Sequence, residues 1–112
     1  MADVAWQPVA RTADLADGDI IPVEVGGRAV IVFRDGDRYG CVQRKCLHQG
    51  GDLANGIISR HHIVCAVHGW RFSTETGIHA ESQQMCLAIH AVRVVDGVIE
   101  VDPTPRRLGS AP

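Results

Sequence analysis

The feature that most constrains the fold is a series of short apolar runs, rich in β-branched residues and divided by turn-forming residues. Two turns stand out, Gly26-Gly27 and Asp96-Gly97, because such pairs permit the positive φ angles of a tight hairpin. Residues 14–18 are the nearest approach to a helix and are too few for more than a turn. The runs with strand character cover residues 20–25, 29–33, 39–43, 57–59, 62–65, 71–74, 87–95 and 98–101. The pattern predicts an all-β fold of antiparallel hairpins.

Length and charge limit the possible functions. The 112 residues suit one domain with one modest core, which excludes a large substrate-binding domain. Eleven Lys and Arg against 13 Asp and Glu give a net charge of −2, which argues against nucleic acid as a partner. The sequence has no signal-peptide pattern and no apolar run long enough to span a membrane, so we expect a cytoplasmic protein without a membrane partner. Residues 103–112 contain three prolines and are expected to form a flexible tail.

Two stretches, residues 44–53 and 66–70, interrupt the strand pattern and lie beside Cys and His residues. Loop one, residues 44–53, contains Cys46-x-His48. Loop two, residues 65–70, contains Cys65-x-x-His68, and sixteen residues separate His48 from Cys65. In a cytoplasmic chain, cysteines spaced in this way favour metal or redox chemistry over a disulfide framework.

Two thiolates and two imidazoles can bind metal in two ways. One tetrahedral Zn²⁺ is possible, but structural zinc sites favour two sulfurs from a single tight turn. Here each loop supplies one sulfur and one nitrogen, which suits a binuclear iron–sulfur centre between the loops, with both sulfurs on one iron and both nitrogens on the other. Gly50, Gly51 and Gly69 allow sharp turns and leave amide groups free to face bridging sulfides.

These motifs, together with several segments around them, resemble Rieske-type [2Fe–2S] proteins, and in particular the ferredoxin components of bacterial ring-hydroxylating oxygenases. The resemblance covers residues 4–102. It implies one Rieske domain over residues 1–112 and one [2Fe–2S] cluster per chain. The segments that carry it include Gly69-Trp-Arg-Phe72, Leu53-Ala-Asn-Gly56, Glu75-Thr-Gly77 and Val94-Val-Asp-Gly-Val-Ile99. The implied parts are an antiparallel β-sandwich or barrel-like base (4–43 and 84–102), an inserted cluster-binding subdomain (about 44–83) and the tail.

The resemblance also implies a ligand set. Cys46 and Cys65 would bind the inner iron, and His48 and His68 the outer one, through which electrons enter and leave. Two ferric ions, two sulfides, two thiolates and two neutral imidazoles sum to zero charge, whereas four thiolates would give −2. A neutral cluster accepts an electron more readily, so the midpoint potential rises to roughly −150 to +300 mV, against about −400 mV for plant-type ferredoxins.

Four positions predict a potential in the lower part of that range. High-potential members of the family have an additional Cys in each loop, where this chain has Gly51 and Val67. They also use Ser and Tyr hydroxyls as hydrogen-bond donors to cluster sulfurs, where this chain has Trp70 and Phe72. Fewer donors to sulfur make the reduced, more negative cluster less favourable.

The other Cys and His residues are expected to have no ligand role. Cys41 and Cys86 are predicted to be small buried residues on strands. His61, His62 and His79 are expected to be solvated, and His90 to be hydrogen-bonded and partly exposed. Trp70 either lines a docking face or covers the core, and the charges of Arg44, Lys45 and Arg71 are either solvated or steer an acidic partner.

The predicted function is electron transfer rather than catalysis. The resemblance implies a monomeric carrier that takes electrons from an NAD(P)H-dependent reductase and passes them to a terminal oxygenase, docking transiently at the tip formed by His48 and His68. One alternative is a small Rieske subunit of a reductase complex such as assimilatory nitrite reductase. Two others are a zinc structural module and an iron–sulfur redox sensor.

Overall fold

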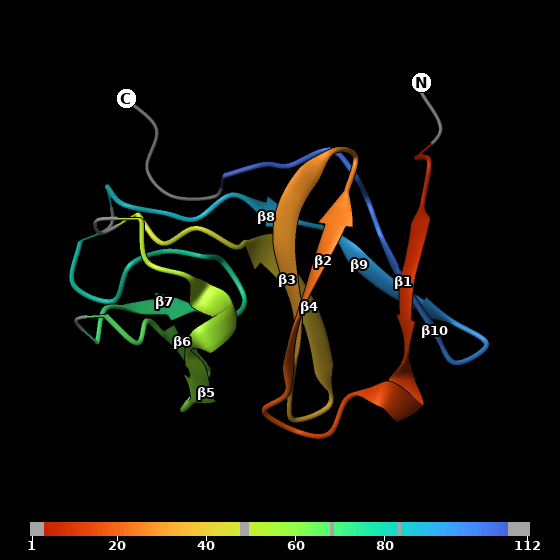
Figure 1. Cartoon of the computed structure of the whole chain (residues 1–112), viewed down its shortest axis with the longest axis horizontal. Helices are drawn as coiled ribbons and strands as arrows, with labels where there is room; N and C mark the ends of the chain where they lie inside the picture. The colour runs from red at the N-terminus through yellow and green to blue at the C-terminus, as the bar shows by residue number, and fades with distance from the viewer. Residues whose placement is uncertain (1–3, 48–49, 68, 83, 108–112) are drawn as a thin grey trace.

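The computed structural model describes residues 4–47, 50–67, 69–82 and 84–107, and it is nearly all β. Three antiparallel sheets lie side by side (Figure 1), which confirms the predicted fold class. The outer sheet has the order β1 (Gln7–Arg11), β10 (Val98–Val101), β9 (Val92–Val95). The central sheet has the order β2 (Ile20–Val25), β3 (Arg28–Asp35), β4 (Arg38–Gln43), β8 (Ile89–His90). The inserted sheet has the order β5 (Ile57–Ser59), β6 (His62–Val64), β7 (Arg71–Ser73).

The two hairpins predicted from turn residues are confirmed. Gly26 and Gly27 have φ angles of +57° and +77° and join β2 to β3. Asp96 and Gly97 have φ angles of +51° and +76° and join β9 to β10. Outside the strands, the described residues hold two 3-10 helices, η1 (Thr12–Asp14) and η2 (Leu53–Asn55). Neither of these is long enough to cross a membrane, and the described part of the chain has no other helix.

The prediction of one continuous strand over residues 87–95 is wrong. Only Ile89–His90 pairs with β4 of the central sheet, whereas Val92–Val95 pairs with β10 of the outer sheet. Ala91 lies between the two strands, and its carbonyl accepts a hydrogen bond of 2.9 Å from the Asp102 amide. The apolar pattern continues through this point although the two strands belong to different sheets: in β9 only Val92 packs against a core, and Val94 and Val95 are exposed. This crossover fastens the outer sheet to the central one.

The inserted sheet carries loop two between β6 and β7 and follows loop one in the chain. β6 and β7 each end one residue before the predicted limit. The amides of Cys65 and Thr74 still bond to carbonyls across this hairpin, at Trp70 and His61, but just outside the assigned ladder. Arg60 and His61 have φ angles of +51° and +64° and form the turn between β5 and β6.

Apolar packing joins the inserted sheet to the central sheet. The junction core contains central-sheet residues such as Phe33 and Val42 and inserted-sheet residues such as Ile63 and Phe72, all buried. Its other buried members are Ile31, Cys46, Leu53, Cys65 and Leu87. A second core lies between the central and outer sheets and consists of Leu15, Val25, Val30, Val32, Cys41, Ile99 and Val101. The base and the two loops are thus one packed unit.

The prediction of a flexible tail from residue 103 is wrong for Arg106 and Arg107. The Arg106 backbone exchanges two hydrogen bonds with Ile89, of 2.7 and 2.9 Å, and extends the central sheet at its edge. The Arg107 guanidinium donates a 2.6 Å hydrogen bond to the carbonyl of Cys86. Proline prevents a regular strand here but does not prevent single backbone pairs. Residues 108–112 of the predicted tail lie outside the described residues.

Candidate metal centre

Loop one is closed at its base by backbone and side-chain contacts. The Cys46 amide donates a 2.6 Å hydrogen bond to the carbonyl of Gly51, and the Leu53 amide donates one of 2.8 Å to the carbonyl of Arg44. Cys46 is buried, with 2% of its surface exposed. His48 falls within this closed segment of the sequence but lies outside the described residues.

An ion pair between Arg44 and Asp52 braces loop one. Arg44 Nε and NH2 donate to the two carboxylate oxygens of Asp52 at 2.9 and 2.8 Å, which is a two-pronged pair. Asp52 Oδ1 also accepts from the Ala54 amide at 2.9 Å, which caps η2. The hydrogen bond from Arg44, the Ala54 amide and the Arg44 charge together outweigh burial and lower the pKa of Asp52. The sequence predicts Arg44 only as a surface charge, so this ion pair with Asp52 is not predicted.

Loop two is the closed end of the β6–β7 hairpin. The Cys65 amide donates a 2.8 Å hydrogen bond to the Trp70 carbonyl, and the Gly69 amide donates one of 3.0 Å to Cys65. Gly69 has φ = +71°, a conformation that glycine adopts without strain. Cys65 is buried, with 1% of its surface exposed. His68 lies outside the described residues.

The two loops meet where Gly51 faces Val67 and Cys65. A Cβ atom placed on Gly51 would lie 2.7 Å from Val67 Cγ2 and 3.1 Å from Cys65 Sγ. The absence of a side chain at Gly51 therefore lets loop one approach the sulfur of loop two. The same Cβ would be 3.5 Å from Val67 Cβ, so the two positions at which high-potential members of the family have an additional Cys are neighbours.

The residues present at this meeting point fit a Rieske-type cluster. Cys46 and Cys65 are buried in the same junction core, one from each loop. A Rieske-type cluster takes two cysteine sulfurs on one of its irons, and these two side chains could supply them. Among the described residues no three potential ligands lie together, and two of the four predicted ligands fall outside those residues.

Aromatic side chains of the inserted sheet and the segment after it pack together at the junction core. Trp70 is partly buried against the junction core. The His79 ring packs edge-on against Trp70 and Phe72, with centroid distances of 4.6 and 5.3 Å. Of the two roles considered for Trp70, packing over the core is therefore present. His79 was expected to be solvated, but it is half-buried and its Nδ1 accepts a 3.0 Å hydrogen bond from the Glu81 amide.

The remaining cysteines and histidines have structural surroundings. Cys41 and Cys86 are buried, as predicted, and burial raises the pKa of the Cys41 thiol to about 12, which keeps it protonated. His90 was expected to be partly exposed but is buried, because its Nδ1 bonds to the Asp102 carbonyl at 2.7 Å beside the crossover. His61 and His62 lie at the β5–β6 turn, away from both loops in the fold.

Several known proteins are similar to this chain. A model of the Rieske [2Fe-2S] domain family matches residues 5–91. The chain is 27% identical to the ferredoxin component of the alkene monooxygenase system of Xanthobacter autotrophicus, over 93% of this chain and 88% of that protein. It is 38% identical to chlorophyllide a oxygenase of Arabidopsis thaliana over 62% of this chain, but it spans only 13% of that much longer protein.

Solved structures give the same picture of the fold. One is a chain of the complex of reduced oxygenase and oxidized ferredoxin in carbazole 1,9a-dioxygenase, with a TM-score of 0.82 and 28% identity. That match covers 93% of this chain and 98% of the other. Another is a putative NADH-dependent nitrite reductase small subunit from Mycobacterium tuberculosis, with a TM-score of 0.83, 18% identity and coverage of 89% and 96%. At that identity the second match shows the fold alone.

Proposed function

The chain belongs to the Rieske [2Fe–2S] family, and from this premise we propose that it is an electron carrier of an oxygenase system. It would take single electrons from an NAD(P)H-dependent reductase in the cytoplasm and deliver them to a terminal oxygenase of the ring-hydroxylating type. The family's cluster supplies the one-electron chemistry when bound. The chain's own part is to bury that cluster, set its potential and present it to two partners in turn.

We assign the ligands as Cys46 and Cys65 on the inner iron and His48 and His68 on the outer iron. The two cysteines support this assignment, because they are the buried thiols at the point where the loops meet. Each histidine follows its cysteine within a segment that closing hydrogen bonds fold back on itself. By the family resemblance, the two histidines would hold the outer, more exposed iron, at which partners would dock.

The observation that carries the proposal is the near-complete coverage of two ferredoxin matches. The alkene monooxygenase ferredoxin component is matched over 88% of its length, and the chain in the carbazole 1,9a-dioxygenase complex over 98%. The longer oxygenases are matched over only a small part of their length, as the 13% coverage of chlorophyllide a oxygenase illustrates. The likeness therefore favours the carrier over the enzyme that uses its electrons.

Metal analysis followed by reduction tests the proposal. The purified protein is expected to contain two irons and two acid-labile sulfides per chain and to give the Rieske electron paramagnetic resonance spectrum when reduced. NADH with a catalytic amount of a Rieske-ferredoxin reductase is expected to bleach its visible absorption. Zinc without sulfide would contradict the proposal and would favour a structural module. The matched control is Cys46→Ser, which is expected to remove the spectrum.

The fold match to a nitrite reductase small subunit keeps one second candidate in view. A subunit of that kind stays bound to its large partner, whereas a carrier must dissociate between reductase and oxygenase. Size-exclusion chromatography of the chain expressed with the products of its neighbouring genes separates the two. We expect a free monomer, and co-elution with a sirohaem protein would favour the nitrite reductase role.

A further inference from the structure

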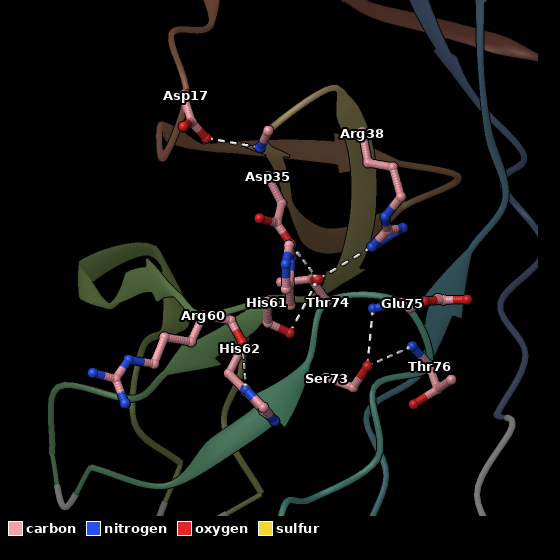
Figure 2. Close-up of polar contacts among 11 residues, drawn as sticks. Asp17, Asp35, Arg38, Arg60, His61, His62, Ser73, Thr74, Glu75 and Thr76 are labelled. Carbon is pink, nitrogen blue, oxygen red and sulfur yellow. Dashed lines mark hydrogen bonds and ion pairs between the residues drawn. The ribbon is translucent and has the colours of Figure 1, made fainter.

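A buried polar contact joins the central sheet to the inserted sheet at the ends opposite the two loops (Figure 2). The Thr74 hydroxyl donates a 2.6 Å hydrogen bond to Asp35 Oδ2 and accepts one of 3.1 Å from Arg38 NH2. His61 Nδ1 lies 3.1 Å from the same carboxylate oxygen, and the His61 carbonyl accepts from the Thr74 amide at 3.0 Å. We call these four residues, Asp35, Arg38, His61 and Thr74, the clip.

The clip lies where two arms of the fold begin. β4 starts at Arg38, which pairs with Asp35, and leads to loop one. β6 starts immediately after His61 and leads to loop two, and β7 returns from loop two to Thr74. Both ligand loops therefore leave the far ends of arms that the clip holds together. The junction core fills the space between the arms.

The carboxylate of Asp35 in the clip is buried and lies near hydrogen-bond donors and a positive charge. The Asp35 side chain is 9% exposed and Thr74 is 4% exposed, whereas the His61 side chain is 85% exposed. A buried carboxylate is costly unless hydrogen bonds and cations surround it, and here a hydroxyl, an imidazole and a guanidinium do so. Beside it, a cleft of about 300 Å³ is lined by Arg38, Thr74 and His90 among other residues.

Backbone strain is present at the same place. Arg60 and His61 both have positive φ angles although neither is glycine. Such conformations are unfavourable for residues with a Cβ atom and persist where the surrounding structure holds them. Two sets of contacts hold this turn: His61 bonds to Asp35 and Thr74, and His62 Nδ1 bonds to the Arg60 carbonyl at 2.9 Å. The central sheet therefore contributes to the shape of the turn between β5 and β6 through Asp35.

We propose that Asp35 and Thr74 are positioning residues that fix loop two relative to loop one and so keep the two halves of the ligand set in register. This rests on the proposed ligand set, because Cys46 lies on one arm and Cys65 on the other. Loop one is continuous with β4, whereas in the described part of the chain loop two is held against the central sheet by the junction core and the clip, and it meets loop one at Gly51. Loss of the clip leaves the hairpin of loop two free to pivot on the core.

Hydrogen exchange and cluster retention in the purified holoprotein test this role. Thr74→Val removes the hydroxyl at nearly constant volume, and Thr74→Ser restores it. Amides of residues 65–70 are expected to exchange roughly fivefold faster or more in Thr74→Val than in the parent, with those of residues 44–53 changed less. Cluster loss to a chelator is expected to accelerate severalfold, with a broader distribution of g values in the reduced state. Thr74→Ser is expected to return all three measurements to parental values.

Two further variants show whether the effect belongs to the clip. Asp17→Asn is the matched control, because Asp17 Oδ1 accepts a 2.8 Å hydrogen bond from the Gly36 amide in the same β3–β4 turn but does not touch the inserted sheet. It is expected to leave loop two unchanged. Asp35→Asn is expected to act in the same direction as Thr74→Val, and the double variant to add little, because both remove one contact.

Two outcomes overturn the proposal. One is parental exchange of residues 65–70 and parental cluster retention in Thr74→Val. The other is an equal acceleration of exchange throughout the chain, which means that Thr74 contributes to overall stability only. Metal and sulfide analysis of the parent separates these outcomes from failure of the proposed function. A parent without iron and sulfide would contradict the carrier role, while the exchange of residues 65–70 would still report on the clip.

Discussion

Loop one and loop two each present one buried cysteine, yet they are fastened to the fold by different forces. Loop one is held within itself by the Arg44–Asp52 ion pair, which is partly exposed to solvent. Loop two is the end of a hairpin that rests on the buried ring of Phe72 and on the clip, in which the side chains of Asp35 and Thr74 are buried. The first attachment is electrostatic and local, and the second depends on packing and on contacts distant in sequence.

Because of this difference, we expect the two ligand loops to respond to different perturbations. Exposed ion pairs contribute little and weaken with added salt, whereas buried packing is insensitive to salt and costly to disturb. A Rieske cluster held between these loops would depend on the ionic conditions through loop one and on the packing of the core through loop two.

Phe72→Ala is expected to have the largest effect and to act on loop two. Phe72 is fully buried in the junction core, and removal of a buried Phe side chain costs about 3–5 kcal/mol. Chemical denaturation followed by circular dichroism measures this loss. Ile57→Ala on the same sheet is the control, because Ile57 is 60% exposed and should change stability by no more than about 0.5 kcal/mol. Similar losses in the two variants would show that loop two does not depend on the core.

The elements of the fold that could be predicted are the ones with local causes. Gly26-Gly27 and Asp96-Gly97 determine their hairpins because the turn needs positive φ angles at those very residues. The crossover at Ala91 could not be predicted, since an apolar run has the same appearance whether its strand serves one sheet or two. The pairing of Arg106 with Ile89 was also missed, because three prolines in a short segment normally indicate a tail.

The same distinction holds for the site. The spacing of Cys46 and Cys65 with their histidines is a local pattern, and the structure places both cysteines at one meeting point. The brace between Arg44 and Asp52 joins residues eight positions apart in an irregular loop, for which no periodicity exists. The hydrogen bond between Asp35 and Thr74 joins residues 39 positions apart and becomes visible only when the sheets are assembled.

A disulfide between the loops would remove much of the difference between them. In Gly51→Cys with Val67→Cys, the Cβ atoms would start about 3.5 Å apart, within the range that a disulfide requires. Closure of a chain segment of this length stabilises a protein by about 3 kcal/mol. A count of free thiols by mass spectrometry verifies the bond, and thermal unfolding with and without reductant measures its effect. No reductant-dependent change in the melting temperature would mean that the loops are already fixed relative to each other.

Acid is expected to weaken both loops, but with different dependence on salt. The Arg44 hydrogen bonds lower the pKa of Asp52. Burial raises the pKa of Asp35, but contacts with Thr74, His61 and Arg38 outweigh it, so the net pKa is lowered. A carboxyl group with a depressed pKa stabilises the fold above its unfolded value of about 3.9, and this contribution is lost as the pH falls through the folded value.

Stability measured between about pH 5 and 2 is therefore expected to decline less steeply in Asp35→Asn and in Asp52→Asn than in the parent. Added salt is expected to reduce the contribution of Asp52, which faces Arg44 near solvent, more than that of Asp35, which faces Arg38 and His61 at a buried position. Equal salt dependence at the two sites would contradict the contrast between an electrostatic and a packed attachment.

The smallest expected effect is on the midpoint potential, and the residue concerned is Phe72 in the junction core. We expect the parent to lie in the lower part of the range of about −150 to +300 mV, because Phe72 occupies the place of a Tyr that donates a hydrogen bond to a cluster ligand in high-potential relatives. Phe72→Tyr adds that donor without removing the ring from the junction core, so the potential is expected to rise while stability changes little. A spectroelectrochemical titration measures the shift, with Phe33→Tyr as a control for a new hydroxyl elsewhere in the same core. An unchanged potential in Phe72→Tyr, with the cluster retained, would show that the ring of Phe72 does not face the sulfurs and that other residues set the potential.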